Sequence, residues 1–505
     1  MPRKPNILIL MADQLTPAAL PAYGNRVART PHLDALAQRS VVFRSAYCNS
    51  PLCAPSRFSF MSGRLPSKIG AYDNAAEFAA QVPTFAHYLR LAGYRTILSG
   101  KMHFCGADQL HGFEERLTTD IYPADFGWTP DWLNFDQRPS WYHSMESVTQ
   151  AGVCARTNQI DFDDEVVFRA RRQLFDMARG TDPRPFCMVV SMTHPHDPFA
   201  ITREYWDRYR DADIDMPRVR LAPEQLDPHS QRLRHVCGMD AQPVSEAQVR
   251  AARHAYYGAV SYVDDHVGAL MATLRDAQFD ADTLTIVLAD HGEMLGERGL
   301  WYKMSFFEPA CRIPLLFHAP QLFQARAVPQ SVSLLDLLPT LAEIAGDGQA
   351  APFATDLEGR SLLPHLQGRD GHDEVLGEYL AEGAVAPLVM IRSGRHKFVH
   401  SPADPDQLYD LSGDRDELHN LAATAREAAG AFRARVARTW TVPQLHAEVL
   451  ASQQRRRLVD AALRLGRRTA WDYEPPLDAS KQYVRNDKAL EELEASARFP
   501  KFVRA

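Results

Sequence analysis

Four short apolar runs, each ending in polar residues, are the main pattern in the first 300 residues. They lie at 6–11, 94–99, 186–192 and 283–289. Short apolar runs bounded by polar residues are typical of strands buried in a parallel sheet. Segments with helical signals separate them: one that begins at Pro31 behind Thr30, one near 83–92 and one over about 249–274. Strands that alternate with helices predict βαβ units and a mostly parallel sheet.

Candidate chemistry follows the end of every predicted strand. The residues that follow the four runs include Asp13 with Gln14, Lys101 with His103, His194 with His196, and Asp290 with His291. In open α/β sheets, ligands bind outside the carboxyl ends of the strands. We therefore expect one polar pocket that is assembled from distant parts of the sequence.

The pattern changes after about residue 375. Apolar alternation at 388–392 and 396–400 flanks Ser393-Gly394-Arg395, which predicts an antiparallel hairpin. A helical stretch with Arg455-Arg456-Arg457 then ends near Gly466, and a polar and aromatic tail follows it. We predict three parts: a catalytic α/β domain over 1–375, a small α+β subdomain over 376–440, and an arm over 441–505. The arm is expected to pack on the body or on a neighbouring subunit, and the three arginines to form a solvated helix face or an oligomer contact.

Composition narrows the class of protein. The 505 residues are 45% hydrophobic and 24% charged, as in an enzyme-sized globular protein. A net charge of −7 gives no footprint for nucleic acid. No apolar run approaches the roughly 18–20 residues of a membrane span, and the first run is too short for a signal peptide. The seven cysteines show no C-x-x-C spacing, so we expect a cytoplasmic protein with reduced thiols and no membrane partner.

The sharpest local motif is centred on a cysteine. Cys53, Pro55 and Arg57 form a C-x-P-x-R pattern that resembles the signature of the type I, formylglycine-dependent sulfatases of the alkaline phosphatase superfamily. The strand-end residues occur in that family's order, and Lys303 occupies its later lysine position. The resemblance covers essentially the whole chain. It implies an alkaline-phosphatase-like α/β fold, with a large, mostly parallel sheet flanked by helices, a smaller C-terminal subdomain containing an antiparallel sheet, and a C-terminal arm.

The resemblance also implies a modified residue and a metal ion. The thiol of Cys53 is expected to be converted to formylglycine by a formylglycine-generating enzyme. The implied ligands of one divalent metal ion are Asp13, Gln14, Cys53, Asp290 and His291. Gln14 replaces a more common Asp of the family and His291 replaces an Asn or Gln. Fewer anionic ligands and one nitrogen leave Ca²⁺, Mn²⁺ and Mg²⁺ open.

The implied catalytic residues surround the sulfate ester. They are Cys53, Arg57, Lys101, His103, His194 and Lys303. Arg57 is expected to orient the formylglycine and His103 to assist breakdown of the sulfated intermediate. Lys101 and Lys303 would bind sulfate, and either His194 or Lys303 would protonate the departing alcohol. His194 is preferred to its neighbour His196.

Within the family, the sequence is most similar to the choline sulfatases. The stretches that carry this are 72–77, 111–117 and 125–130, together with the long arm. A quaternary ammonium cannot donate hydrogen bonds, so it requires aromatic faces and a carboxylate. The candidate residues for choline are Asn74, Trp128, Glu382 and, from the arm of another subunit, Glu491. A homo-oligomer, either a dimer or a tetramer, is expected.

The sequence therefore predicts a sulfuric ester hydrolase that cleaves the S–O bond of choline O-sulfate and releases choline and sulfate. One alternative is a phosphonate monoester or phosphodiester hydrolase, or a promiscuous aryl sulfatase, of the same superfamily. Another is a catalytically silent protein that binds sulfated or quaternary ligands. Ordinary structural roles compete with these assignments: Trp128 can belong to the core, Glu382 can have a similar structural role, and Glu491 can be a charge on a helix surface.

Overall fold

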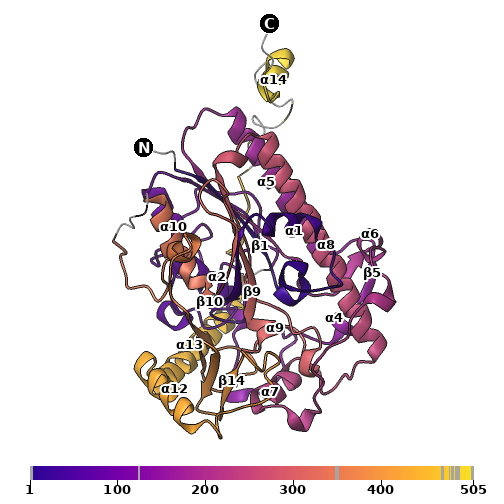
Figure 1. Ribbon diagram of the computed structural model, residues 1–505, viewed down its shortest axis with the longest axis vertical. Helices are drawn as coiled ribbons and strands as arrows, with labels where there is room; N and C mark the ends of the chain where they lie inside the picture. Colours follow the sequence, from indigo (N-terminus) through magenta and orange to yellow (C-terminus); the bar gives the residue numbers. More distant parts are fainter. Residues whose placement is uncertain are drawn as a thin grey trace.

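The structure is a computed structural model that describes residues 4–122, 125–346, 348, 352–467, 471–476, 478, 483 and 489–501. Part of the predicted arm lies outside these residues. In the described part, eight strands form one sheet in the order β10-β2-β9-β8-β1-β6-β3-β4 (Figure 1). Their bounds are β1 Asn6–Ala12, β2 Val41–Tyr47, β3 Arg95–Gly100, β4 Glu115–Arg116, β6 Phe186–Met192, β8 Thr283–Ala289, β9 Arg312–His318 and β10 Arg326–Ser333.

The four predicted strands are confirmed as β1, β3, β6 and β8, and they are neighbours in the sheet. They run parallel, with Ile9 of β1 level with Val189 of β6 and Ile286 of β8. Their side chains are buried almost throughout, which explains why they appear as continuous apolar runs. Only β9 is antiparallel to both of its neighbours in this sheet, so the expected mostly parallel topology is confirmed.

Helices cover the sheet on two sides. Figure 1 shows α5 and α8 on one side and α2 and α10 on the other. The predicted helices are confirmed as α1, α3 and α8. The α-helices of the catalytic region are α1 Pro31–Ala37, α2 Cys53–Ser62, α3 Phe85–Leu91, α4 Glu146–Thr149, α5 Asn158–Arg179, α6 Arg203–Trp206, α7 Pro228–Val236, α8 Glu246–Asp276, α9 Glu308–Cys311, α10 Leu337–Ala345 and α11 Leu363–Leu366. A separate pair of short strands, β5 Gly152–Cys154 and β7 Ala200–Thr202, lies beside α8.

A second, antiparallel sheet follows in the chain. Its strands are β11 Glu374–Tyr379, β12 Leu388–Ser393, β13 His396–Ser401 and β14 Asp404–Asp410. The predicted hairpin is confirmed as β12 and β13. Helix α12 (Arg426–Thr439) packs on this sheet, with the ring of Phe432 stacked on that of Phe398 at 5.4 Å. The buried ammonium of Lys397 pairs with Glu308 at 3.0 Å, which ties this sheet to the catalytic region. The exact domain boundaries stay predictions.

The arm begins with α13 (Val442–Leu463), as the helical stretch around Arg456 predicted. The expectation of a solvated arginine face fails for Arg456. This side chain is buried, and its guanidinium binds both carboxylate oxygens of Asp73 at 2.6 and 2.7 Å. Helix α14 (Leu490–Ala497) extends beyond the body of the chain near the C-terminus (Figure 1). In the described residues, no helix is both long and apolar enough to span a membrane.

Candidate active site

The parallel strands deliver the predicted polar residues to one place. Asp13 follows β1, Lys101 follows β3 and Asp290 follows β8. The end of β3 passes close to β6 because Gly100 has no side chain. A Cβ at Gly100 would lie 2.1 Å from the carbonyl oxygen of Ser191, and the backbone there has a φ of +106°. Only glycine can therefore bring Lys101 to this position.

Cys53 occupies the centre of the cluster. It is the first residue of α2 and is buried. Its Sγ lies 3.2 Å from Nε2 of His291 and 3.8 Å from Nζ of Lys101. The next backbone N–H, that of Ala54, donates to Oδ1 of Asn74 at 3.0 Å. The structure thus brings the predicted nucleophile and the predicted substrate contact Asn74 to the same helix end.

Four of the five implied metal ligands converge. The ligand atoms of Asp13, Cys53, Asp290 and His291 all lie within 4.8 Å of one another, and all four residues are buried. Nδ1 of His291 contacts the carbonyl oxygen of Gly292 at 3.0 Å. This contact assigns the ring proton to Nδ1 and leaves the Nε2 lone pair directed at the cluster, an arrangement common for metal-binding histidines. The donor set therefore fits a divalent cation.

Gln14 is directed differently. Its backbone N–H donates to Oδ1 of Asp290 at 3.0 Å, whereas its side-chain Oε1 accepts a hydrogen bond from Nζ of Lys303 at 2.6 Å. Its Nε2 donates to the carboxylate of Glu293. Gln14 thus contacts the metal cluster through its backbone and Lys303 through its side chain.

Buried cations balance the carboxylates. The Nε of Arg57 donates to Asp290 at 2.8 Å and its Nη2 to Asp13 at 3.2 Å. Lys101 pairs with Asp13 as well. Burial alone would raise the pKa of Asp13, but the nearby positive charges, led by that of Lys101, hold it well below its ordinary value. Asp13 is therefore charged and able to bind a cation.

The two histidines after β6 occupy different environments. Nδ1 of His194 contacts Oδ2 of Asp163 on α5 at 2.7 Å, and its ring packs on Tyr262. Nε2 of His196 lies 2.9 Å from Nζ of Lys303. Burial, together with the charge of Lys303, lowers the pKa of His196 well below its ordinary 6.5, so this ring is neutral. The preference for His194 stays a prediction: Asp163 holds its Nδ1, its Nε2 has no partner among the described residues, and His196 is the one of the two that contacts Lys303.

The ring of His103 lies near two aromatic side chains, Trp128 and Tyr122. Its backbone has a φ of +62°, and its N–H donates to Asp120 at 2.9 Å. The ring is buried, and among the described residues neither of its nitrogens has a hydrogen-bond partner. Its centroid lies 5.8 Å from that of Trp128 and 6.3 Å from that of Tyr122. Both ring nitrogens of His103 therefore remain available to a substrate.

Glu382 supplies a buried carboxylate near the cluster. It is 5% exposed, and its Oε2 has no hydrogen-bond partner in the described part of the chain. Burial raises its pKa to about 7, whereas the positive charge of Lys303 acts to lower it. Trp128 stacks on Trp141, and the centroids of the two nearly parallel rings are 6.3 Å apart. Glu491 is exposed on α14 and lies outside this constellation within the chain.

Sequence reasoning missed two residues of the site. Tyr122 lies in a loop and belongs to no strand end or motif. The Nζ of Lys101 is 4.4 Å from its ring centroid, and the ring of His196 is 5.8 Å away. Glu293 directly follows the Asp290-His291-Gly292 motif, and this adjacency was the one signal that could have found it.

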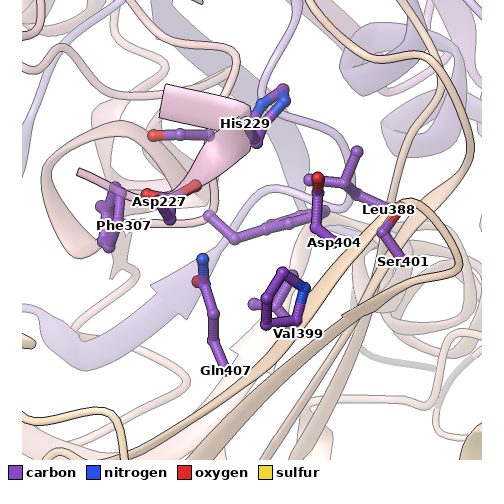
Figure 2. A pocket seen from close by; sticks show the side chains of 11 residues that line it. Asp227, His229, Phe307, Leu388, Val399, Ser401, Asp404 and Gln407 are labelled. Atoms are coloured by element: carbon purple, nitrogen blue, oxygen red, sulfur yellow. The ribbon is translucent and has the colours of Figure 1, made fainter. Parts of the chain in front are cut away.

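A separate cavity lies where the second sheet meets α7. Figure 2 shows its lining, which includes His229, Asp404 and Gln407. Its volume of about 20 Å³ leaves room for about one water molecule. It is therefore too small to be a substrate site.

Comparison with known families gives three matches along the chain. The profile described as Sulfatase matches residues 5–347, and the one described as Choline sulfatase enzyme C terminal matches residues 447–499. The profile described as N-sulphoglucosamine sulphohydrolase, C-terminal matches residues 296–435.

Individual relatives agree with these matches. The chain is 47% identical over 510 residues to a choline-sulfatase of Rhizobium meliloti, covering 99% of each chain. It is 28% identical over 423 residues to human iduronate 2-sulfatase, covering 72% of this chain and 74% of that one. The crystal structure of the phosphonate monoester hydrolase of Agrobacterium radiobacter has a TM-score of 0.68 and 25% identity, covering 88% of this chain and 96% of that one.

Proposed function

The chain belongs to the sulfatase family, and we propose that its substrate is choline O-sulfate, which it hydrolyses to choline and sulfate. The family match and the relative at 47% identity make it a sulfuric ester hydrolase. We propose choline O-sulfate as the substrate because that relative is a choline-sulfatase. The proposal then depends on what this chain's own pocket offers to a quaternary ammonium.

The observation that carries the choline proposal is the carboxylate of Glu382. A buried carboxylate oxygen without a partner is costly, and a bound cation removes that cost. A quaternary ammonium suits the position because it brings charge without hydrogen bonds. Trp128 beside His103 would supply the aromatic face, and Asn74 lies at the end of α2 next to the nucleophile.

Residue 53 fits the modification that is general in the family. Hydrated formylglycine at this position would supply a hydroxyl nucleophile for the attack on sulfur. Its hydroxyls would lie where Sγ now contacts His291 and Lys101. Arg57 anchors the same helix to Asp13 and Asp290, so it fixes the direction from which residue 53 approaches the substrate.

The chain's cations would bind the sulfate group. Lys101 and Lys303 are both buried and charged, and such preorganised charges stabilise negative charge in a low-dielectric site. Lys303 also contacts His196, whose neutral Nε2 accepts from the ammonium and orients it, so that Lys303 can pass a proton to the departing alcohol. We assign this role to Lys303 with His196. His103 has two free ring nitrogens, which suits it to take a proton from residue 53 when sulfate is released.

The four-donor cluster would hold one divalent metal ion through Asp13, residue 53, Asp290 and His291, with Gln14 at its edge. When bound, the ion would act as a Lewis acid on the sulfate oxygens. Ca²⁺, Mn²⁺ and Mg²⁺ all remain candidates, and the imidazole of His291 favours Mn²⁺ over the harder ions. Measuring the metal content of the purified protein by mass spectrometry tests this.

The partners in the proposal are a formylglycine-generating enzyme during maturation and further copies of the chain. Support for a homo-oligomer comes from α14, which carries the exposed Glu491 away from its own body. In a dimer or tetramer this carboxylate could join the site of a neighbouring copy. A cytoplasmic location is also proposed, and sedimentation and cell fractionation test these two points.

Kinetics with protein co-expressed with the modifying enzyme test the function. We expect kcat/KM for choline O-sulfate to exceed that for an aryl sulfate and for a phosphodiester. If kcat/KM is higher for a phosphonate monoester than for choline O-sulfate, the second candidate function, a phosphonate monoester hydrolase, is favoured. The similarity to the Agrobacterium enzyme supports this candidate. In ¹⁸O-labelled water the label should enter sulfate, and label in choline would contradict S–O cleavage.

A further inference from the structure

Glu293 lies in the sequence between His291 of the metal cluster and Lys303, and it contacts neither of them directly. It follows His291 by two residues, and it is 1% exposed. Its two carboxylate oxygens have separate sets of partners, one on its own loop and one on Gln14, which follows β1.

The first oxygen holds the loop that carries Lys303. Oε1 of Glu293 accepts the backbone N–H of Leu295 at 2.8 Å and that of Tyr302 at 2.7 Å. Tyr302 and Met304, on either side of Lys303, have left-handed φ values of 69° and 70°. Non-glycine residues adopt this strained backbone only where their surroundings hold it in place. Oε1 thus braces the backbone immediately before Lys303.

The second oxygen decides which way the Gln14 amide points. Oε2 of Glu293 accepts from Nε2 of Gln14, and Oδ1 of Asp197 lies 3.4 Å from the same nitrogen. Ionised carboxylates can only accept, so the NH₂ group faces Asp197 and the ionised form of Glu293, whose pKa burial raises to about 7. The amide oxygen then faces the ammonium of Lys303, which can only donate. Charge and hydrogen-bond polarity therefore select one of the two amide orientations.

We infer that Glu293 is a positioning residue that acts on Lys303 through Gln14: its carboxylate fixes the Gln14 amide so that the oxygen points into the site and holds the Lys303 ammonium. The inference rests on the proposed function, because it assigns Lys303 a part in sulfate ester hydrolysis. A carboxylate at position 14 would face the carboxylates of Glu293 and Asp197, whereas an amide satisfies them.

Glu293→Gln is the direct test because it changes polarity but not shape. The oxygen of the new amide must stay with the two backbone N–H groups, so its NH₂ group would face that of Gln14. Gln14 must then flip and turn its own NH₂ toward Lys303. A hydrogen bond to a charged group is worth about 1.5–3 kcal/mol, so we expect kcat to fall about 10- to 100-fold.

The exchanged pair Gln14→Glu with Glu293→Gln restores the polarity. One oxygen of the carboxylate at position 14 would accept from the amide at position 293 and the other from Lys303. Repulsion between this carboxylate and Asp197, which lies 3.4 Å from the Gln14 amide in wild type, limits the recovery. The kcat should then recover to within about fivefold of wild type if the two residues act as a coupled pair. Recovery is the readout that a merely structural role of Glu293 would not give.

Glu297→Gln is the matched control. Glu297 lies in the same loop as Glu293. Its carboxylate accepts a hydrogen bond from the backbone N–H of Val219 at 2.8 Å and does not contact Gln14. It therefore also uses a carboxylate to hold backbone, but it has no route to Lys303 through the Gln14 amide. This control should keep wild-type kcat.

Two results would overturn the inference: wild-type kcat and KM in Glu293→Gln, or no recovery in the exchanged pair. If the exchanged pair does not fold, Gln14→Met provides a second background. Adding Glu293→Gln to it should change kcat less than about threefold, because the route through Gln14 is already absent. A full 10- to 100-fold loss in that background would place the effect in the loop and refute the route.

All variants are assayed on choline O-sulfate and on 4-nitrophenyl sulfate, with urea unfolding measured in parallel. If wild type hydrolyses neither ester, the proposed function fails. The non-additive shift in urea midpoint between positions 14 and 293 still tests their pairing, since it needs no substrate. Additive midpoints would refute the pairing.

Discussion

Replacing Glu382 by Gln should separate recognition of choline from recognition of sulfate. The substitution keeps the shape of the side chain but removes its charge. The carboxylate is buried, and its Oε2 has no partner in the described residues. Choline O-sulfate has a quaternary ammonium that can interact with this carboxylate, whereas 4-nitrophenyl sulfate has no positive charge. Only the first substrate should therefore respond to the change.

The size of the effect follows from the burial of the pair. Two opposite unit charges roughly 5 Å apart, in a site with an effective dielectric constant of about 20, attract each other by about 3 kcal/mol. Since about 1.4 kcal/mol corresponds to a factor of ten, kcat/KM for choline O-sulfate should fall roughly 100- to 300-fold. The value for 4-nitrophenyl sulfate should change by less than about threefold, because its leaving group is uncharged.

The pH dependence has a definite sign. Burial raises the pKa of Glu382 from 4.5 to about 7, so the carboxylate binds a cation fully only above that pH. For wild type, kcat/KM for choline O-sulfate should rise as pH increases through 7. The variant should lack this rise, because Gln does not titrate.

Stability should change in the opposite direction from activity. Between pH 4.5 and about 7 the folded protein keeps a proton on Glu382 that the unfolded chain has released, so stability falls as pH rises through this window. The full cost, on the order of 3 kcal/mol, is present above pH 7. Glu382→Gln should therefore be more stable than wild type at pH 8 and equal to it at pH 4.

Steady-state kinetics on both esters from pH 5.5 to 9, with urea unfolding at pH 8, measure these effects. Glu448→Gln serves as the control, because Glu448 is an exposed carboxylate on α13 and should change neither quantity. An equal loss of activity on both substrates would mean that Glu382 acts on the sulfate end. Unchanged kinetics with choline O-sulfate would refute the proposed cation site.

The remaining predictions concern the arm, the general acid, the aromatic face and the metal. Arg456→Ala leaves the buried carboxylate of Asp73 without its partner, so the free energy of unfolding in urea should fall by about 3–5 kcal/mol. The control Arg455→Ala, at an exposed position, should change it little. His196→Ala should lower kcat about 10²- to 10⁴-fold with little change in KM, whereas His194→Ala should mainly lower the melting temperature; the reverse result would restore the role that the sequence assigned to His194. Trp128→Leu should raise KM for choline O-sulfate by an amount that corresponds to about 0.5–2 kcal/mol of binding free energy, and it should leave KM for 4-nitrophenyl sulfate unchanged. Equal increases in KM for both esters would argue for a packing role of Trp128. Chelation of the metal should abolish turnover and lower the melting temperature, and re-addition should restore both in proportion to metal concentration; full activity in metal-free protein would exclude the proposed cluster.

The convergence of the cluster could be predicted from the sequence because parallel strands share an edge. Once the runs at 6–11 and 283–289 are strands of one parallel sheet, Asp13 and Asp290 must meet at their carboxyl ends. The second sheet followed from a similarly local signal, the glycine-containing turn at Gly394. In both cases the pattern of the chain and the geometry of the sheet carry the same information.

Other features depended on contacts that no local pattern encodes. His194 and His196 are two residues apart in one turn, and their different environments are set by Asp163 on one side and Lys303 on the other. The arginine run looked like a surface face because its partner, Asp73, is 383 residues away from Arg456. Such pairings are decided by which elements pack together, and a single sequence does not state this.

The arrangement of charges accounts for how an acidic protein can use a sulfate ester. Around Cys53, the cations Arg57, Lys101 and Lys303 offset the carboxylates of Asp13, Asp290 and Asp197, and a divalent ion would make the pocket positive. Glu382 provides the opposite charge within electrostatic reach of Lys303. Choline O-sulfate has the same distribution, with an anionic sulfate at one end and a cation at the other, and no net charge. The net charge of −7 therefore neither attracts nor repels it as a whole, whereas the local dipole orients it with sulfate at the nucleophile. An aryl sulfate is a net anion with no group for Glu382, so it meets repulsion from the protein and leaves that carboxylate unpaired. The proposed preference for the zwitterion would thus follow from where the charges are placed, not from how many the chain carries.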